Sequence, residues 1–208
     1  MDPIDIEKYA SVMKEIKLRT EVIGLFLSGQ REAHYVPTTI ETVGLQFRKV
    51  FEPIAFASLA ANRDQYSLAY RDFAKHWEAA KLLKNLRRIN PDFYPKPVVE
   101  EPTDIPGVLH SLQNRQQDYL TENDLVTSHG RCGALMHGAN PFGQPIDYSF
   151  YQQSFPLWIA KTINLLNNHQ VHLLGDPGFY LFHMKEEGHD EVRWYRFQPP
   201  AGGAALKC

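Results

Sequence analysis

The sequence predicts a mainly α-helical protein: a helical bundle followed by a small C-terminal antiparallel β-hairpin or three-stranded sheet. Apolar residues recur every three or four positions through most of residues 1–168, which is the repeat of helices with one buried face. After residue 170 the pattern changes to alternation, which is typical of strands. A stretch with five prolines, at 91–107, interrupts the helical repeat and is expected to be an extended connector.

The first half of the chain predicts three long helices. The first ends at Gly29 and carries one apolar stripe along its whole length. The second begins near Thr38, which has a glutamate at capping-box spacing three residues later, and Pro53 is expected to kink or interrupt it. Residues 50–61 are apolar nearly all round, so this helix is expected at the centre of the bundle. The third helix is expected over about 64–89.

The second half predicts shorter elements. We expect a short helix around 107–120, then a helix opened by Thr121 and Asp124 that ends by Gly138. A further helix is expected from Ser154 to about residue 167. The alternating segments at 171–174, 179–185 and 191–197 then predict the hairpin with its third strand. These elements divide the chain into a bundle at 1–168, a β appendage packed on it at 169–198, and a flexible tail at 199–208.

Composition excludes several classes of protein. The formal net charge is −2, so no global basic field indicates nucleic acid. We expect a cytoplasmic protein with no membrane partner, because the N-terminus lacks a signal peptide and no apolar run has the length of a membrane span. The two cysteines, Cys132 and Cys208, make no disulfide framework. The signatures of P-loop, dinucleotide-binding, zinc-protease and serine-hydrolase sites are missing from the sequence.

The first candidate site is Arg131 with His137. Arginine binds phosphate and keeps its charge, and histidine transfers protons near neutral pH, so together they could cut RNA. On a straight helix, however, the two side chains would point about 120° apart. They would converge only if the arginine reached round, if the helix ended between them, or if a second subunit supplied part of the site. The other interpretation is a polar helix end packed through Leu135 and Met136.

The second candidate pair is Arg71 with His76, on the third predicted helix. This helix carries six basic residues against two acidic ones between 71 and 88, an excess that favours a phosphate backbone. The other interpretation is an ordinary solvated helix face. The residues predicted to bind RNA are Lys75, Lys81, Lys84, Arg87 and Arg88.

Two features of the C-terminal region give further hypotheses. Four histidines and Asp190 fall within a short stretch, but no cysteine lies at zinc-site spacing among them, so we predict neither a metal nor another cofactor. The aromatic residues of the hairpin, beside Arg193 and Arg196, could stack on bases, or they could cover a helical core or an interface. The histidines are His169, His172, His183 and His189; the aromatics are Phe179, Tyr180, Phe182, Trp194, Tyr195 and Phe197.

The helical pattern and the two Arg-x(4–6)-His matches together resemble the HEPN superfamily (higher eukaryotes and prokaryotes nucleotide-binding). The resemblance covers about residues 4–168. It implies a compact helical bundle that commonly dimerises, and in many members a metal-independent endoribonuclease of toxin–antitoxin, antiphage defence or RNA-processing systems. Arg71 precedes a polar residue, as in the common catalytic form of the motif. Arg131 precedes Cys132, a departure from that form, but it lies in a late helix, where the family motif tends to sit.

The sequence therefore predicts a HEPN-like protein that binds RNA or cuts it without a metal, using Arg131 and His137. The alternative is a non-catalytic helical interaction module, such as an antitoxin, a scaffold or a subunit of a defence complex. A metal-dependent hydrolase using the C-terminal histidines is a third class. The expected partners are RNA and either a second copy of the chain or another protein.

Overall fold

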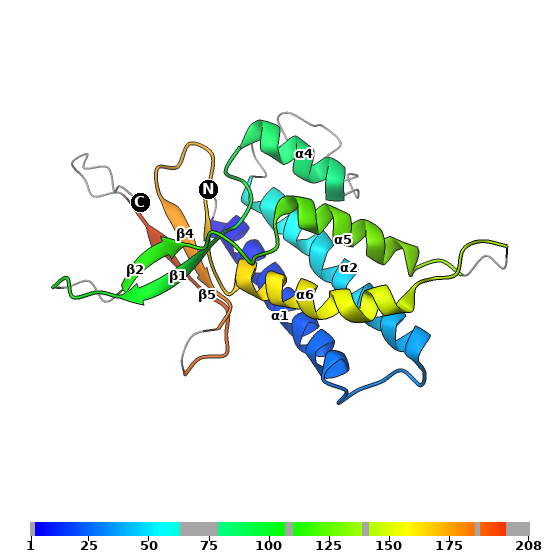
Figure 1. Cartoon of the computed structure of the whole chain (residues 1–208). Helices are drawn as coiled ribbons and strands as arrows, with labels where there is room; N and C mark the ends of the chain where they lie inside the picture. The colour runs from blue at the N-terminus through cyan, green and yellow to red at the C-terminus, as the bar shows by residue number, and fades with distance from the viewer. Residues whose placement is uncertain (1–2, 63–78, 107–109, 139–141, 186–187, 199–208) are drawn as a thin grey trace.

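A computed structural model of the chain describes residues 3–62, 79–106, 110–138, 142–185 and 188–198. A group of helices makes up most of the molecule, and a five-stranded antiparallel sheet lies at one end of it (Figure 1). The described helices are α1 (Pro3–Leu27), α2 (Val36–Ala61), α4 (Ala79–Ile89), α5 (Glu122–Ala134) and α6 (Tyr148–Leu166). The strands are β1 (Lys96–Pro102), β2 (His110–Asn114), β3 (Asn168–Val171), β4 (Phe179–His183) and β5 (Arg193–Phe197).

Helix α2 lies at the centre of the helical group, as its apolar sequence predicts. It packs against α1, α4, α5 and α6. Phe47 and Phe51 on α2 are fully buried, and Phe47 contacts the rings of Phe155 and Trp158 on α6. The expected interruption at Pro53 is wrong, because α2 continues through it to Ala61. Packing on several sides of the helix holds this stretch helical although proline removes one backbone hydrogen bond.

The predicted helix ends are partly confirmed. Gly29 follows α1 with a φ of 76°, a left-handed conformation that glycine adopts without strain. Thr121 and Asp124 form the predicted capping box of α5. The capping box predicted at Thr38 is wrong, because α2 already begins at Val36 and the Thr38 hydroxyl donates to the Tyr35 carbonyl at 3.0 Å. Helix α6 begins before the predicted Ser154, at Tyr148, where the Asp147 side chain caps it.

The predicted fold class, a helical bundle with a small hairpin or three-stranded sheet, is wrong. The sheet has five strands in the order β2-β1-β3-β4-β5, all antiparallel, so the fold is mixed α+β. Strand β1 comes from the proline-rich segment, and β2 replaces the helix expected at 107–120. Both strands belong to the range 1–168 that the sequence assigned to the bundle, and β1 pairs with β3 from the C-terminal range.

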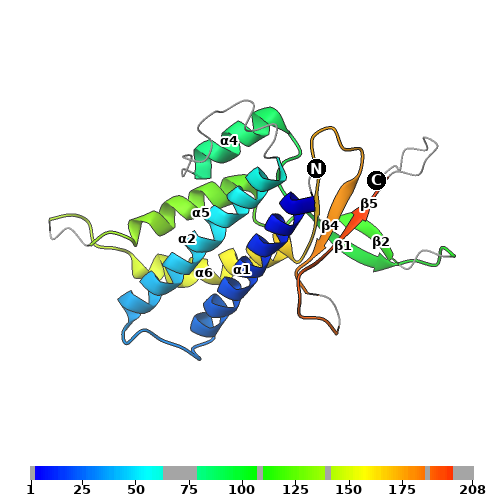
Figure 2. The same cartoon turned by 180° about the vertical axis from the view of Figure 1, so that it is seen from behind.

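One face of the sheet packs against the helices. All the labelled helices lie on the same side of the sheet in both views (Figures 1 and 2). On that face Tyr9 of α1 contacts the rings of His169 on β3 and Phe182 on β4. Because antiparallel partners share a face, Trp194 of β5, which pairs with Phe182, also lies on the helix side. The opposite face carries the alternate residues of each strand.

Candidate functional site

Arg131 and His137 lie at the C-terminal end of α5, and the helix ends between them. The α-helix stops at Ala134. Beyond it the backbone N–H groups of Leu135 and Met136 donate to carbonyls three residues back, each at 3.1 Å, and so tighten the final turn. His137 follows in a bend. This is one of the three conditions under which the two side chains could act on the same ligand.

Arg131 is exposed, yet its position is fixed by α6. Its guanidinium carbon lies 5.2 Å from the centre of the Phe150 ring, which is the geometry of a cation–π contact. Its backbone carbonyl accepts a hydrogen bond from the Tyr151 hydroxyl at 2.9 Å. The guanidinium is therefore held beside an aromatic ring with its donors open to solvent, where a phosphate can approach.

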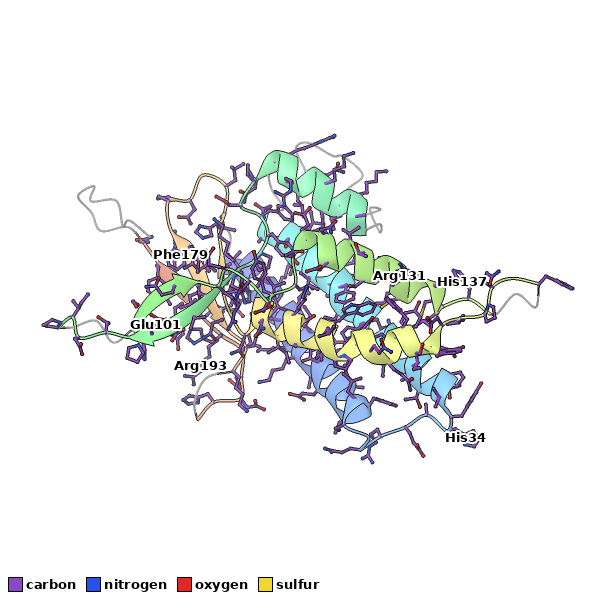
Figure 3. The ribbon with its side chains drawn as sticks, in the orientation of Figure 1. His34, Glu101, Arg131, His137, Phe179 and Arg193 are labelled. Carbon is purple, nitrogen blue, oxygen red and sulfur yellow. The ribbon has the colours of Figure 1, made fainter. Side chains whose placement is uncertain are left out.

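His137 is exposed at the same end of α5 (Figure 3). Within the described residues, no hydrogen bond or ion pair joins His137 to Arg131. Leu135, between them, is buried, and Met136 packs against the core. The packing that the polar-helix-end interpretation requires is therefore present, and it leaves both polar side chains outside the core.

A second polar group near this site joins α2 to α5. The Glu52 carboxylate oxygen Oε1 lies 2.9 Å from Arg48 Nε and 2.9 Å from His129 Nε2. The three side chains are between 17% and 35% exposed. A Cβ atom at Gly133 would lie 3.2 Å from Arg48 Nη1, so the glycine leaves room for the guanidinium against α5.

The sequence analysis did not identify this group. His129 stands two residues before Arg131 in the same stretch, and Arg48 and Glu52 are four residues apart on one helix face. The four-residue spacing of Arg48 and Glu52 could have indicated an ion pair on α2. The contact of Glu52 with His129 depends on how α2 packs against α5, which the sequence does not show. Cys132, next to Arg131, is buried, and burial raises the pKa of its thiol to about 12. It is therefore a packing residue and not a nucleophile.

The predicted RNA-binding residues fall partly on α4, which packs beside α5 (Figure 1). Arg87 forms an ion pair with Glu122 in the first turn of α5, and its guanidinium carbon lies 5.8 Å from the Phe93 ring centre. The exposed basic residues of α4 are Lys81, Lys84, Arg87 and Arg88. Arg71, Lys75 and His76 lie outside the described residues, so the second candidate pair stays a prediction.

The C-terminal histidines are separated by the fold. His169 is fully buried; its Nδ1–H donates to the Leu166 carbonyl at 2.8 Å, and its Nε2 accepts from the Tyr9 hydroxyl at 2.9 Å. His183 Nε2 lies 2.8 Å from Glu100 Oε1 on β1. Asp190 pairs with Lys17 of α1 at 2.7 Å. Within the described part of the chain, no three histidine, cysteine or carboxylate side chains converge as metal ligands.

No protein-family model, curated protein or solved structure matches this chain. The resemblance to the HEPN superfamily therefore stays an expectation from the sequence. Among the described helices, none combines the length and the apolar character needed to cross a membrane.

Proposed function

We propose that this chain is a cytoplasmic HEPN-like protein that binds RNA and cuts it without a metal, using Arg131 and His137. The observation that carries the proposal is the end of α5 at Ala134, between two exposed side chains of the required chemistry. On a continuous helix these side chains would diverge, whereas here the turn after the helix sets the direction of His137 independently of that of Arg131.

The proposed reaction is a transesterification within RNA. His137 accepts the proton of the 2′-hydroxyl, the 2′-oxygen bonds to phosphorus, and the bond from phosphorus to the 5′-oxygen breaks. Solvent water gives a proton to the departing 5′-oxygen and His137 releases its proton to solvent, which leaves a 2′,3′-cyclic phosphate, a 5′-hydroxyl and the neutral histidine. Arg131 stabilises the negative charge that builds up on the phosphate oxygens.

We assign the proton transfer to His137 and not to His129. His129 Nε2 is engaged by Glu52 at 2.9 Å, and its side chain is only 17% exposed. Arg48 shares the same carboxylate oxygen, so the group ties α2 to α5. The exposed basic residues of α4 would extend the contact with RNA along the neighbouring helix.

Cleavage of a labelled single-stranded RNA in EDTA tests the proposal. The wild-type protein is expected to cut the RNA, and Arg131→Ala and His137→Ala are each expected to lower the rate by a factor of about 10² or more. Matched controls are Arg31→Ala and His34→Asn in the exposed loop after α1. Asparagine suits residue 34 because its φ is 70°. Cleavage that survives both site variants would contradict the assignment.

A second candidate function is a non-catalytic interaction module, favoured by an apolar stripe on the outer face of α1. Leu18, Val22 and Leu25 are 59%, 36% and 38% exposed, at the four- and three-residue spacing of one helix face. A second copy of the chain or another protein could cover this stripe. Under this alternative, Leu18→Glu with Val22→Glu would abolish association measured by light scattering, while Arg131 and His137 would be dispensable.

A further inference from the structure

The face of the sheet that points away from the helices has its own chemistry. The β4–β5 register places Phe179 opposite Phe197, Leu181 opposite Tyr195 and His183 opposite Arg193, and these six residues share this face. Leu181 is buried, yet it lies outside the main core cluster. The helix-side residues of the same strands, such as Tyr180 and Phe182, belong to that core.

Two of the aromatic side chains on this face present large areas to solvent. Tyr195 is 40% exposed and Phe197 is 42% exposed. Phe197 lies nearly parallel to Phe179, with 6° between the ring planes and 5.1 Å between the ring centres. The ring of Tyr195 lies 5.5 Å from that of His183. These contacts with rings on β4 hold both exposed side chains against the sheet.

The polar groups beside these rings favour an anionic ligand with flat apolar parts. Arg193 lies on the same face, two residues before Tyr195, and it can contact a phosphate. Glu100, a carboxylate on the same face of β1, has Oε1 2.8 Å from His183 Nε2.

We propose that this face of the sheet binds single-stranded nucleic acid, with unpaired bases stacking on Tyr195 and Phe197 and a phosphate on Arg193. Aromatic rings on a strand accept any base, because every base presents a flat face. A duplex keeps its bases stacked inside and would not fit this mode. The surface lies at the opposite end of the molecule from Arg131 and His137 (Figure 3), so it does not depend on the proposed cleavage.

Fluorescence anisotropy with two labelled twelve-nucleotide probes, oligouridylate RNA and oligothymidylate DNA, tests this proposal. Both are expected to bind, because stacking does not require the 2′-hydroxyl, and a duplex of the same length is expected to bind more weakly. Tyr195→Ala and Phe197→Ala are each expected to weaken binding of the single strands by at least about fivefold. Arg193→Ala is expected to lower the slope of log affinity against log salt by about one.

Matched controls are available elsewhere on the surface. Tyr35, at the start of α2, is 56% exposed, and Phe142, after α5, is 97% exposed. Tyr35→Ala and Phe142→Ala are expected to leave binding unchanged. Circular dichroism and a thermal melt show whether each sheet variant is folded.

A photo-crosslink locates the ligand without any variant. An oligonucleotide containing 5-iodouridine, bound to the wild-type protein and irradiated, is expected to join to the peptide that contains Tyr195 and Phe197. Crosslinks confined to other peptides would overturn the proposal, as would unchanged affinity in both folded sheet variants or no binding of either single strand at low salt. A cleavage assay in which RNA is not cut would leave these binding results unaffected, so the two proposals fail separately.

Discussion

Two histidines show how differently the two ends of the molecule use the same side chain. His169, where α1 meets the sheet, is fully buried and has a hydrogen-bond partner on each ring nitrogen. His137, after α5 at the other end, is exposed. Burial lowers the pKa of His169 to about 4, so this histidine is neutral at physiological pH. The sequence neighbours of the two histidines do not reveal which of them is buried and neutral, whereas the structure does.

The comparison teaches that His169, the first of the four C-terminal histidines, has a structural role. The Tyr9 hydroxyl must donate to His169 Nε2, because the neutral ring carries its proton on Nδ1, which donates to the Leu166 carbonyl. Burial raises the pKa of Tyr9 and keeps this hydroxyl protonated. Such a buried pair fixes the packing of α1 on the sheet. Variants at the two ends should therefore separate loss of stability from loss of function.

The largest expected difference is in stability. His169→Ala would leave a cavity and an unpaired Tyr9 hydroxyl in the core, and we expect it to lower the free energy of unfolding by about 3 to 5 kcal/mol. His137→Ala should change it by less than about 0.5 kcal/mol, because the side chain is exposed. Urea unfolding of the two variants measures both values. Equal losses of stability in the two variants would contradict the difference in burial between His169 and His137.

The next effect is on the pH dependence of stability. The folded pKa of His169, about 4, is below the unfolded value of about 6.5, so the unfolded chain binds more protons between these two pH values. Stability is therefore complete above about pH 6.5 and falls by about 3 kcal/mol as the pH drops to about 4. Urea unfolding at several pH values measures this slope. His169→Gln should reduce the slope in this window, and His137→Ala should retain it.

A smaller effect is expected from the tyrosine partner. Tyr9→Phe keeps the ring but removes the hydroxyl that donates to His169 Nε2 at 2.9 Å. We expect a loss of about 1 to 3 kcal/mol, since a buried acceptor is left without its donor. Tyr35→Phe, at an exposed tyrosine, is the matched control and should be neutral. A neutral Tyr9→Phe in thermal unfolding would count against a structural role for the pair.

The smallest effect concerns the opposite end of α5 from the proposed site. Thr121 accepts from the backbone N–H of Asp124 at 3.1 Å, so Thr121→Ala should cost about 1 kcal/mol of stability. The rate of RNA cleavage by the folded variant should not change, because the cap lies at the other end of the helix. Thr127→Ala, at an exposed position within α5, is the control. A change in cleavage rate without a change in stability would place the cap within the functional site.

The helices were predictable because their signal is local. The apolar stripe of α1 and the buried face of α2 follow the helical period, and the capping box at Thr121 lies within four residues. Strand β1 was not predicted, because the prolines of 91–107 indicated a connector, and β2 lies where a short helix was expected. In the structure β1 pairs with β2 along Val98–Pro102, and Pro97 pairs with His169 of β3, a partner distant in sequence.

The candidate site was predictable in its residue types but not in its surroundings. Arg131 and His137 were identified from a short motif, whereas the tie of Arg48 and Glu52 to His129 depends on how α2 packs against α5. The sheet aromatics illustrate the same limit. Alternation separates Tyr195 from Trp194, but it cannot show which face the helices cover.

The most direct test of the central claim is the chemical identity of the RNA ends produced by purified protein in EDTA. The proposed mechanism predicts 2′,3′-cyclic phosphate and 5′-hydroxyl ends by mass spectrometry, and it predicts that His137→Ala yields almost none while remaining folded. Ends carrying 3′-hydroxyl and 5′-phosphate groups, or the same cyclic products from folded His137→Ala protein, would contradict the assignment of RNA cleavage to the end of α5.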